Sequence, residues 1–369
     1  MGSIGPRRLV FGAPTSGVVF RPTPPAVLLP TVSIVIVTWN GRSLLERFLP
    51  SVLATDYPRL EVVVADNASI DGSAAWLRAT HPEAVVVEHA TNGMFARGNN
   101  DAIPHTSGDL LVFLNNDVEV PAGWLRPLVA TFEDPEVAAA QPKLLQHGDR
   151  GRFEYAGASG GFVDAFGYPF TRGRIFDTLE ADHGQYDDAR DVFWATGAAL
   201  AIRREAFIEA GGFDVGFEMH MEEIDLCWRL WRAGKRVRVV PASEAYHLGG
   251  ASLPQGDPRK AYYNFRNSLA MLAKNLPDAA LRRVLLARRA LDAVAATRAR
   301  LGGNRQEAEA IGQAWADFRT RLPTLPRPPR TEAAVLPPYR GSLVADYFVR
   351  GHRHFSDLPA SRFRRLARP

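Results

Sequence analysis

The chain of 369 residues contains a single cysteine, Cys227. Without a second cysteine it has no internal disulfide, which excludes the small secreted folds that depend on disulfide bonds and fits a reducing compartment. The first 30 residues also lack the continuous apolar core of a signal peptide, because prolines interrupt them. We therefore expect a flexible tail over residues 1–30 and a cytoplasmic protein.

A long apolar helix is missing as well. Residues 22–41 carry no charge, but they include four prolines and a β-branched run. Such a stretch is a poor transmembrane helix, and we predict a tail that leads into a buried strand. The sequence shows no internal repeat.

Acidic residues are scarce toward the end of the chain. Residues 259–369 hold 22 Lys and Arg against 8 Asp and Glu, whereas residues 1–258 hold 22 against 32. A basic extension on an acidic body indicates an anionic partner, either nucleic acid or a membrane surface. No nucleic-acid-binding module is recognisable, so we expect no nucleic acid and predict peripheral contact with the inner face of the plasma membrane. Residues 281–301, with six arginines, suit a helix lying on lipid and equally a solvated packing helix.

The body of the chain alternates short apolar runs with helical patterns. The first run, residues 32–37, is rich in β-branched residues and suits a strand buried on both faces, as in a parallel sheet. Further strands are predicted at 61–65, 84–88 and 110–114, and helices at 42–53, 71–79 and 95–103. This alternation predicts an α/β fold with right-handed crossovers, in which ligands bind beyond the carboxyl ends of the strands.

The pattern changes after residue 141. Glycines break residues 141–191, where we predict extended strands and loops, followed by another strand and turn at 192–202. The remaining predictions are helices at 204–210 and 221–233, a strand at 237–240, basic helices after residue 257 and a proline-rich linker at 323–338. We therefore divide the chain into an α/β domain over 31–258, a basic helical extension over 259–322, and a linker with a C-terminal tail over 323–369.

Polar residues follow two of the predicted strands. Asp66 comes after the second strand. A carboxylate at the end of a buried strand contributes little to stability, so we expect it to accept hydrogen bonds from a base or ribose. Asn115-Asn116-Asp117 follows the fourth strand. Mg²⁺ prefers one or two carboxylates plus phosphate oxygens and water, and one Asp with neighbouring amides fits that preference. The alternative for each segment is an ordinary strand-end turn.

Two loops offer backbone groups to a ligand. Thr38-Trp39-Asn40-Gly41 ends the first strand with a strong turn signal, and residues 92–100 place amides and small residues at a helix start. Such segments allow a base or phosphate to approach backbone N–H groups. Taken alone, each segment is also explained as a turn or a helix cap.

Three acids begin the predicted helix at 221–233. The helix macrodipole favours acids at Glu222, Glu223 and Asp225, but three of them repel one another unless a cation relieves the repulsion. One of them is therefore a candidate general base. His247, beyond the next strand, is a candidate ligand of a metal or a diphosphate, although an isolated histidine is usually structural.

Together these residues resemble a family 2 glycosyltransferase of the group that includes rhamnosyltransferases. The resemblance covers residues 31–275 and rests on the order of the motifs: Thr-Trp-Asn-Gly, Asp-Asn-x-Ser-x-Asp-Gly, the Asn-rich segment, Asn-Asn-Asp, Trp-x-Thr-Gly-Ala, Gly-Gly-Phe-Asp, Glu-Glu-x-Asp-Leu-Cys-Trp-Arg and His247. It implies the GT-A fold, a nucleotide-sugar-binding α/β domain, which here would occupy residues 31–258 and carry the basic helical extension.

The resemblance also implies roles for single residues. Glu223 takes the position of the acceptor base, and Asp117 with His247 would hold Mg²⁺ or Mn²⁺. The nucleotide-sugar side comprises Thr38, Asn40, Asp66, Asn67, Asn92, Gly98 and Asn116. The acceptor and sugar side comprises Trp194, Thr196, Gly197, Glu222 and Asp225. Two departures from the family pattern are Met94, where a glycine is often found, and the single carboxylate in Asn-Asn-Asp.

The activity implied is an inverting, single-displacement transfer of a sugar from a nucleotide diphosphate to a hydroxyl of a glycan or lipid-linked acceptor in cell-surface polysaccharide synthesis. The expected donor is dTDP-L-rhamnose, and a UDP-hexose is the alternative. A non-catalytic sugar-nucleotide-binding protein is a second alternative. A nucleotidyltransferase would need a glycine-rich, basic loop after the first strand, which residues 38–42 do not supply.

Overall fold

The first half of the fold is a parallel sheet with helical crossovers. The computed structural model describes residues 1–2, 5, 29–249, 257–328 and 334–366, so most of the predicted tail at 1–30 lies outside the described residues. The elements run β1 (Val32–Thr38), α1 (Arg42–Leu53), β2 (Leu60–Asp66), α2 (Ser73–Thr80), β3 (Val85–Glu88), α3 (Met94–Ala102) and β4 (Leu110–Leu114). They match the predicted alternation closely.

These four strands end at one edge of the sheet. The register pairs Thr38 of β1 with Asp66 of β2, and Val32 of β1 with Leu110 of β4, all in parallel. Strand β1 is buried on both faces, as its continuous apolar, β-branched sequence predicts. The polar residues that follow β1, β2 and β4 are therefore delivered to the same side of the molecule.

The second half completes the sheet with strands of both directions. Its elements are β5 (Val118–Glu119), α4 (Leu125–Ala130), β6 (Val137–Gln146), β11 (Arg190–Asp191), β12 (Ala199–Arg203), α5 (Arg204–Glu209), α6 (Glu222–Arg232) and β13 (Arg236–His247). Within the described residues, nine strands form one sheet in the order β11-β13-β6-β12-β4-β1-β2-β3, with β5 paired to β13. This mixed sheet between helices confirms the predicted α/β class.

Three details of this half differ from the prediction. Strand β6 was not expected, because its sequence is rich in alanine and contains Pro142. The strand predicted at 192–202 begins only at Ala199, since residues 193–194 donate their amides to the carbonyl of Gly161 in another segment. Strand β13 extends seven residues beyond the predicted end at 240, past an irregularity in its pairing with β6 between Val240 and Glu244.

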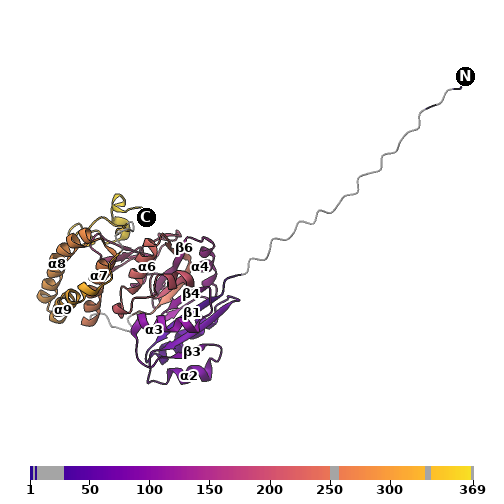
Figure 1. Ribbon diagram of the computed structural model, residues 1–369, viewed down its shortest axis with the longest axis horizontal. Helices are drawn as coiled ribbons and strands as arrows, with labels where there is room; N and C mark the ends of the chain where they lie inside the picture. The colour runs from indigo at the N-terminus through magenta and orange to yellow at the C-terminus, as the bar shows by residue number, and fades with distance from the viewer. Residues whose placement is uncertain (3–4, 6–28, 250–256, 329–333, 367–369) are drawn as a thin grey trace.

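The glycine-broken segment forms a small second sheet of four antiparallel strands among the described residues: β7 (Gly161–Val163), β8 (Pro169–Thr171), β9 (Arg174–Ile175) and β10 (Thr178–Leu179). Helices α7 (Pro258–Asn275), α8 (Asp278–Leu301) and α9 (Arg305–Arg321) follow, and Figure 1 shows them grouped beside the main sheet, with α7 nearest to α6. The short α10 (Leu343–Phe348) lies in the tail.

The tail packs into the main core. Tyr339, Leu343, Tyr347 and Leu358 belong to the same cluster of buried side chains as the residues of β12 and α6. The indole N–H of Trp228 donates to the carbonyl of Val335 at 2.9 Å. In the described part of the chain, no helix combines the length and the apolar character needed to span a bilayer.

Candidate active site

The last residue of β2 and the residue after it are buried, and each has a side-chain oxygen without a hydrogen-bond partner. Asp66 is 2% exposed; its Oδ2 accepts from the amide of Ser69 at 3.0 Å, while its Oδ1 has no partner. The Asn67 side chain donates from Nδ2 to the carbonyl of Met94 at 2.9 Å and leaves Oδ1 without a partner. A buried polar atom without a partner is costly, so these oxygens are available to a ligand that reaches the sheet edge.

The loop after β1 is tied to its neighbours by side-chain hydrogen bonds. Asn116 donates from Nδ2 to Thr38 Oγ1 at 2.9 Å. Asn40 has a positive φ of 47°, its amide donates to Ser69 Oγ at 2.8 Å, and its Oδ1 accepts from the amide of Ile70 at 2.9 Å. The loops after β1 and β2 are thereby joined into one rim.

A glycine that was first interpreted as a turn residue proves essential to this rim. A Cβ added at Gly41 would lie 2.3 Å from Thr38 Oγ1 and 2.5 Å from Asn116 Nδ2. Only glycine therefore allows these two side chains to meet over the start of α1. The Asn-Gly dipeptide signalled the turn, but the contact with Asn116 depends on the tertiary fold.

Asn92 and Gly98 support the rim from α3. Asn92 Oδ1 accepts from the amide of Met94 at 2.8 Å and so fixes the approach to the helix. A Cβ at Gly98 would lie 2.8 Å from both polar atoms of the Asn67 side chain. Gly98 thus leaves room for Asn67, and the structure gives both residues a supporting position behind the sheet edge.

Asp117 and His247 form a buried pair on the other side of β4. His247 pairs with Val118 across the β13–β5 bridge, which brings its Nε2 to 3.0 Å from Asp117 Oδ1. The opposite nitrogen, Nδ1, lies 3.2 Å from Glu154 Oε1. Burial lowers the pKa of His247, but the carboxylates of Glu154 and Asp117 outweigh burial and raise this pKa to about 10.

Asp117 and His247 are the candidate metal ligands of this site. The 3.0 Å between Asp117 Oδ1 and His247 Nε2 is a hydrogen bond here, and a metal held by the pair would take the place of the proton on Nε2. Glu154 stands behind the imidazole, as carboxylates do behind metal-binding histidines. Among the described residues, no group of three His, Cys, Asp or Glu side chains is arranged as a complete site, so the other ligands would be diphosphate oxygens and water.

Glu222 and Glu223 begin α6 with one unpartnered oxygen each. Oε2 of both side chains is buried and makes no hydrogen bond. Burial raises the pKa of Glu223 to about 7. Burial and the neighbouring Glu223 and Asp225 raise the pKa of Glu222 well above its usual value. A carboxylate that titrates near neutral pH is suited to accept a proton from a hydroxyl.

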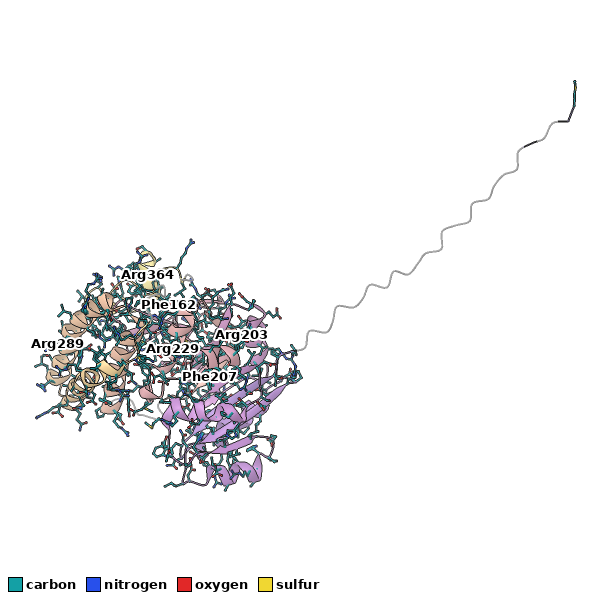
Figure 2. All side chains as sticks on the ribbon, viewed as in Figure 1. Phe162, Arg203, Phe207, Arg229, Arg289 and Arg364 are labelled. Carbon is teal, nitrogen blue, oxygen red and sulfur yellow. The ribbon has the colours of Figure 1, made fainter. Side chains whose placement is uncertain are left out.

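Asp225 has a different environment from the two glutamates. It is fully buried, and its carboxylate accepts from Arg229 at 2.9 Å, Lys274 at 2.8 Å and Asn275 at 2.8 Å. Figure 2 shows Arg229 in the middle of the molecule, between the sheet and the C-terminal helices. Because both oxygens of Asp225 are occupied, this residue ties α6 to α7 and leaves nothing free for a sugar.

Trp194 and Thr196, which were also predicted on the acceptor side, are buried in the core. Trp194 is 2% exposed, and its indole N–H donates to the carbonyl of Phe162 at 2.9 Å. Thr196 is 1% exposed, and its Oγ1 accepts from the amide of Ala198 at 3.2 Å. Their polar atoms are thus occupied within the core, and neither side chain presents a free group to an acceptor.

Gly197 links the two halves of the site. A Cβ added there would lie 3.7 Å from the Glu223 Cβ and 3.1 Å from the ring of Phe95. The next residue, Ala198, accepts a hydrogen bond from the amide of Asn115 at 3.1 Å. Since Asn115 begins the segment that ends in Asp117, Glu223 and the Asp117–His247 pair lie at the same end of β4 and β12.

Comparisons with known proteins identify related sequences. The family model "Glycosyl transferase family 2" matches residues 33–209. The O-antigen biosynthesis protein RfbC of Myxococcus xanthus is 32% identical over 64% of this chain, which spans only 19% of that relative. N-acetylglucosaminyl-diphospho-decaprenol L-rhamnosyltransferase of Mycobacterium tuberculosis is 30% identical over 58% of this chain and 75% of its own length.

A solved structure supports the fold. The crystal structure of GalNAc-T7 with UDP, GalNAc and Mn²⁺ matches 67% of this chain and 49% of its own with a TM-score of 0.54, at 22% identity. This likeness confirms the GT-A architecture predicted from the motif order.

Proposed function

We propose that this chain, which belongs to glycosyl transferase family 2, is a glycosyltransferase. It would move L-rhamnose from dTDP-L-rhamnose to a hydroxyl of a glycan or lipid-linked acceptor in cell-surface polysaccharide synthesis. The similarity to an L-rhamnosyltransferase supports this donor, and a UDP-hexose is the alternative. The name of this relative gives its acceptor as N-acetylglucosaminyl-diphospho-decaprenol, which supports a lipid-linked acceptor here.

The observation that carries the proposal is the unpartnered carboxylate oxygen of Glu223 at the end of the sheet where Asp66, Asn67 and Asp117 gather. In the reaction, Glu223 accepts the proton of the acceptor hydroxyl while that oxygen forms a bond to the anomeric carbon. The bond from this carbon to the donor diphosphate breaks, and the nucleoside diphosphate leaves with the electron pair. Attack opposite the leaving group inverts the configuration at the anomeric carbon.

Asp117 and His247 are the residues that would hold Mg²⁺ or Mn²⁺ beside the diphosphate. The bound ion would neutralise negative charge that develops on the leaving group. The structural relative solved with Mn²⁺ supports a divalent metal. Asp66, Asn67 and the Thr38–Asn116 rim would bind the nucleoside.

The substitution Asp117→Asn tests the metal assignment because the amide can keep the contact with His247 while removing the charge. Because the Asp117 carboxylate helps raise the pKa of His247, we expect the unliganded melting temperature to fall, so the ligand-induced shift of each variant is measured from its own unliganded value. The thermal shift produced by a nucleoside diphosphate with Mn²⁺ should fall to the shift seen with EDTA. A full Mn²⁺-dependent shift in Asp117→Asn would exclude this carboxylate as a ligand.

A thermal-shift screen of dTDP-, UDP- and GDP-sugars with Mn²⁺ tests the function itself. A donor that binds only the folded protein raises the melting temperature by mass action. The selected donor is then incubated with membrane lipid extracts, and both nucleoside diphosphate release and sugar incorporation are measured. Binding without release or incorporation would favour the non-catalytic sugar-nucleotide-binding protein.

We also propose that the protein contacts the inner face of the plasma membrane through one face of α8. Leu286, Val294 and Leu301 are 74%, 66% and 85% exposed on this face. A shallow groove lined by Ala293, Val294 and Leu301 runs beside them. Figure 2 shows Arg289 at the outer edge of the helical side of the molecule. Exposed apolar side chains among arginines suit an anionic lipid surface.

Vesicle flotation tests this membrane contact. The full chain should float with vesicles of phosphatidylglycerol and phosphatidylcholine at low salt, and less of it should float at 0.5 M salt. Salt screens the attraction between arginines and anionic lipid, since the Debye length is already as short as about 10 Å at 0.1 M. Leu286→Glu should weaken flotation, and Glu209→Gln, an exposed change on α5, should not. Protein that stays in solution with anionic vesicles at low salt would remove the membrane assignment.

A further inference from the structure

The turn that leads into α6 is held in a conformation that its side chains disfavour. Glu218, His220 and Met221 all have a positive φ, of 65°, 65° and 74°, although none is glycine. Residues with side chains enter this region only when the surrounding structure enforces it, and such positions cluster at functional sites. The next two residues are Glu222 and Glu223, so the direction in which these carboxylates emerge depends on this turn.

A single side chain from α7 grips the backbone of the turn. Asn267 is fully buried and donates from Nδ2 toward three carbonyl oxygens, those of Phe217 at 2.9 Å, Met219 at 2.7 Å and His220 at 2.9 Å. Helices α6 and α7 are in contact, and Figure 1 shows them next to each other. The amide of Asn267 therefore fixes the chain at the residues just before the acidic helix start.

Neighbouring residues of α7 orient this amide and hold the turn's side chain. Arg266 donates from Nε to Asn267 Oδ1 at 2.8 Å, which directs Nδ2 toward the turn. Arg266 also donates from Nη2 to the carbonyl of Phe217 at 3.0 Å. Tyr263 donates its hydroxyl to Glu218 Oε2 at 2.8 Å. The three residues occupy one face of α7, at intervals of three and one.

The turn is also held from the nucleotide side. The amides of Phe95 and Ala96, at the start of α3, both lie 3.2 Å from the carbonyl oxygen of Glu218. The same helix carries Gly98, which packs against Asn67. Residue 218 thus joins the loop proposed to bind the nucleotide to the helix that carries the proposed base.

We infer that Asn267, oriented by Arg266, is a positioning residue that aims Glu223 at the acceptor by holding the strained turn at 218–221. This inference rests on the proposed role of Glu223. Asn267 lies in the helical extension outside the α/β sheet, so the extension completes the site. Because a small displacement of a catalytic group can cost about 10²-fold in rate, removing this grip should lower kcat strongly.

The test compares Asn267→Ala with Ser268→Ala, a matched change at the next position of α7. Ser268 is also buried, and its hydroxyl accepts from Arg288 of α8 and does not touch the turn. Hydrogen exchange of the peptide over residues 217–226 should quicken in Asn267→Ala and not in Ser268→Ala. Unchanged exchange in Asn267→Ala would overturn the inference whatever the activity.

Kinetics with the donor selected by the screen provide the second readout. We expect Asn267→Ala to lose about 10²-fold in kcat while the donor KM and the thermal shift with the matching nucleoside diphosphate and Mn²⁺ stay near wild type. Faster exchange with an unchanged kcat would overturn the positioning role. If Asn267→Ala does not fold, Tyr263→Phe, which removes only the hydrogen bond to Glu218, should show both effects more weakly, and wild-type behaviour there would overturn it.

The two readouts separate this inference from the proposed function. If the wild-type protein turns over no nucleotide sugar, the proposed transfer is wrong. The inference that Asn267 positions Glu223 as a catalytic base is then wrong too. The exchange measurement would still decide whether Asn267 holds the turn.

Discussion

Among the three acids of α6, Glu223 combines partial exposure with an unpartnered oxygen. The substitution Glu223→Gln keeps the shape of the side chain but removes its ability to accept a proton. We expect kcat to fall by about 10²–10⁴-fold with little change in the donor KM, because general-base catalysis typically contributes that much. Steady-state kinetics on the purified variant measure both constants, with Glu209→Gln as a surface control. Wild-type turnover in Glu223→Gln would exclude the assigned role.

The same residue predicts the acid side of the pH profile. Burial raises the pKa of Glu223 to about 7, and a base must be deprotonated to act. Activity should therefore rise with pH up to about 7 and level off above it, since the carboxylate is protonated below this pKa and charged above it. The profile of kcat/KM in the free enzyme reports this value. A limb near pH 4.5 would mean that Glu223 is solvated like an ordinary glutamate.

Helix α3 packs closely against Asn67 because residue 98 is a glycine and has no Cβ. In an isolated helix, Gly→Ala stabilises by about 1 kcal/mol. At Gly98 the added Cβ would lie 2.8 Å from the Asn67 amide and 3.0 Å from Val37 Cγ1, so Asn67 or the helix must move. We expect Gly98→Ala to lower the melting temperature and to weaken nucleoside diphosphate binding, measured by thermal unfolding and calorimetry.

Gly312→Ala is the matched control for Gly98→Ala. Gly312 lies in α9, and an added Cβ there meets nothing within 4 Å. Gly312→Ala should therefore show the propensity effect alone and raise stability by up to about 1 kcal/mol. If both substitutions stabilise the protein equally, α3 does not pack against Asn67 as the structure indicates.

Elements with a local signal were predictable, and those set by distant contacts were not. Strands β1, β2 and β4 were found because β-branched runs and short loops identify them, and parallel strands bring Asp66 and Asp117 to one edge. Strand β6 was missed because alanine and Pro142 give it no strand propensity, and burial on both faces decides its conformation. Trp194 looked like an acceptor-side residue, yet its ring packs against Gly161, 33 positions earlier.

At the scale of the whole molecule, the C-terminal tail is part of the core. The sequence suggested a linker because prolines are frequent there, and nothing local shows that aromatic residues beyond it return to the second sheet. Tyr339 packs between the rings of Phe170 and Phe363, and its hydroxyl donates to the buried Asp346 at 2.5 Å. Asp346 also accepts hydrogen bonds from Arg350 and Arg362, so this one carboxylate links three separate residues of the tail.

Tyr339→Ala tests whether this packing stabilises the whole protein. Truncating a fully buried aromatic residue typically costs about 3–5 kcal/mol, and here it also removes one donor from Asp346. We expect a single unfolding transition at a clearly lower temperature, because the tail shares its core with β12 and α6. Val349→Ala, at a tail residue that is 82% exposed, should leave the transition in place. A tail that melted separately, with the main transition unchanged, would show that the two parts fold independently and that Trp228 does not need its contact with Val335.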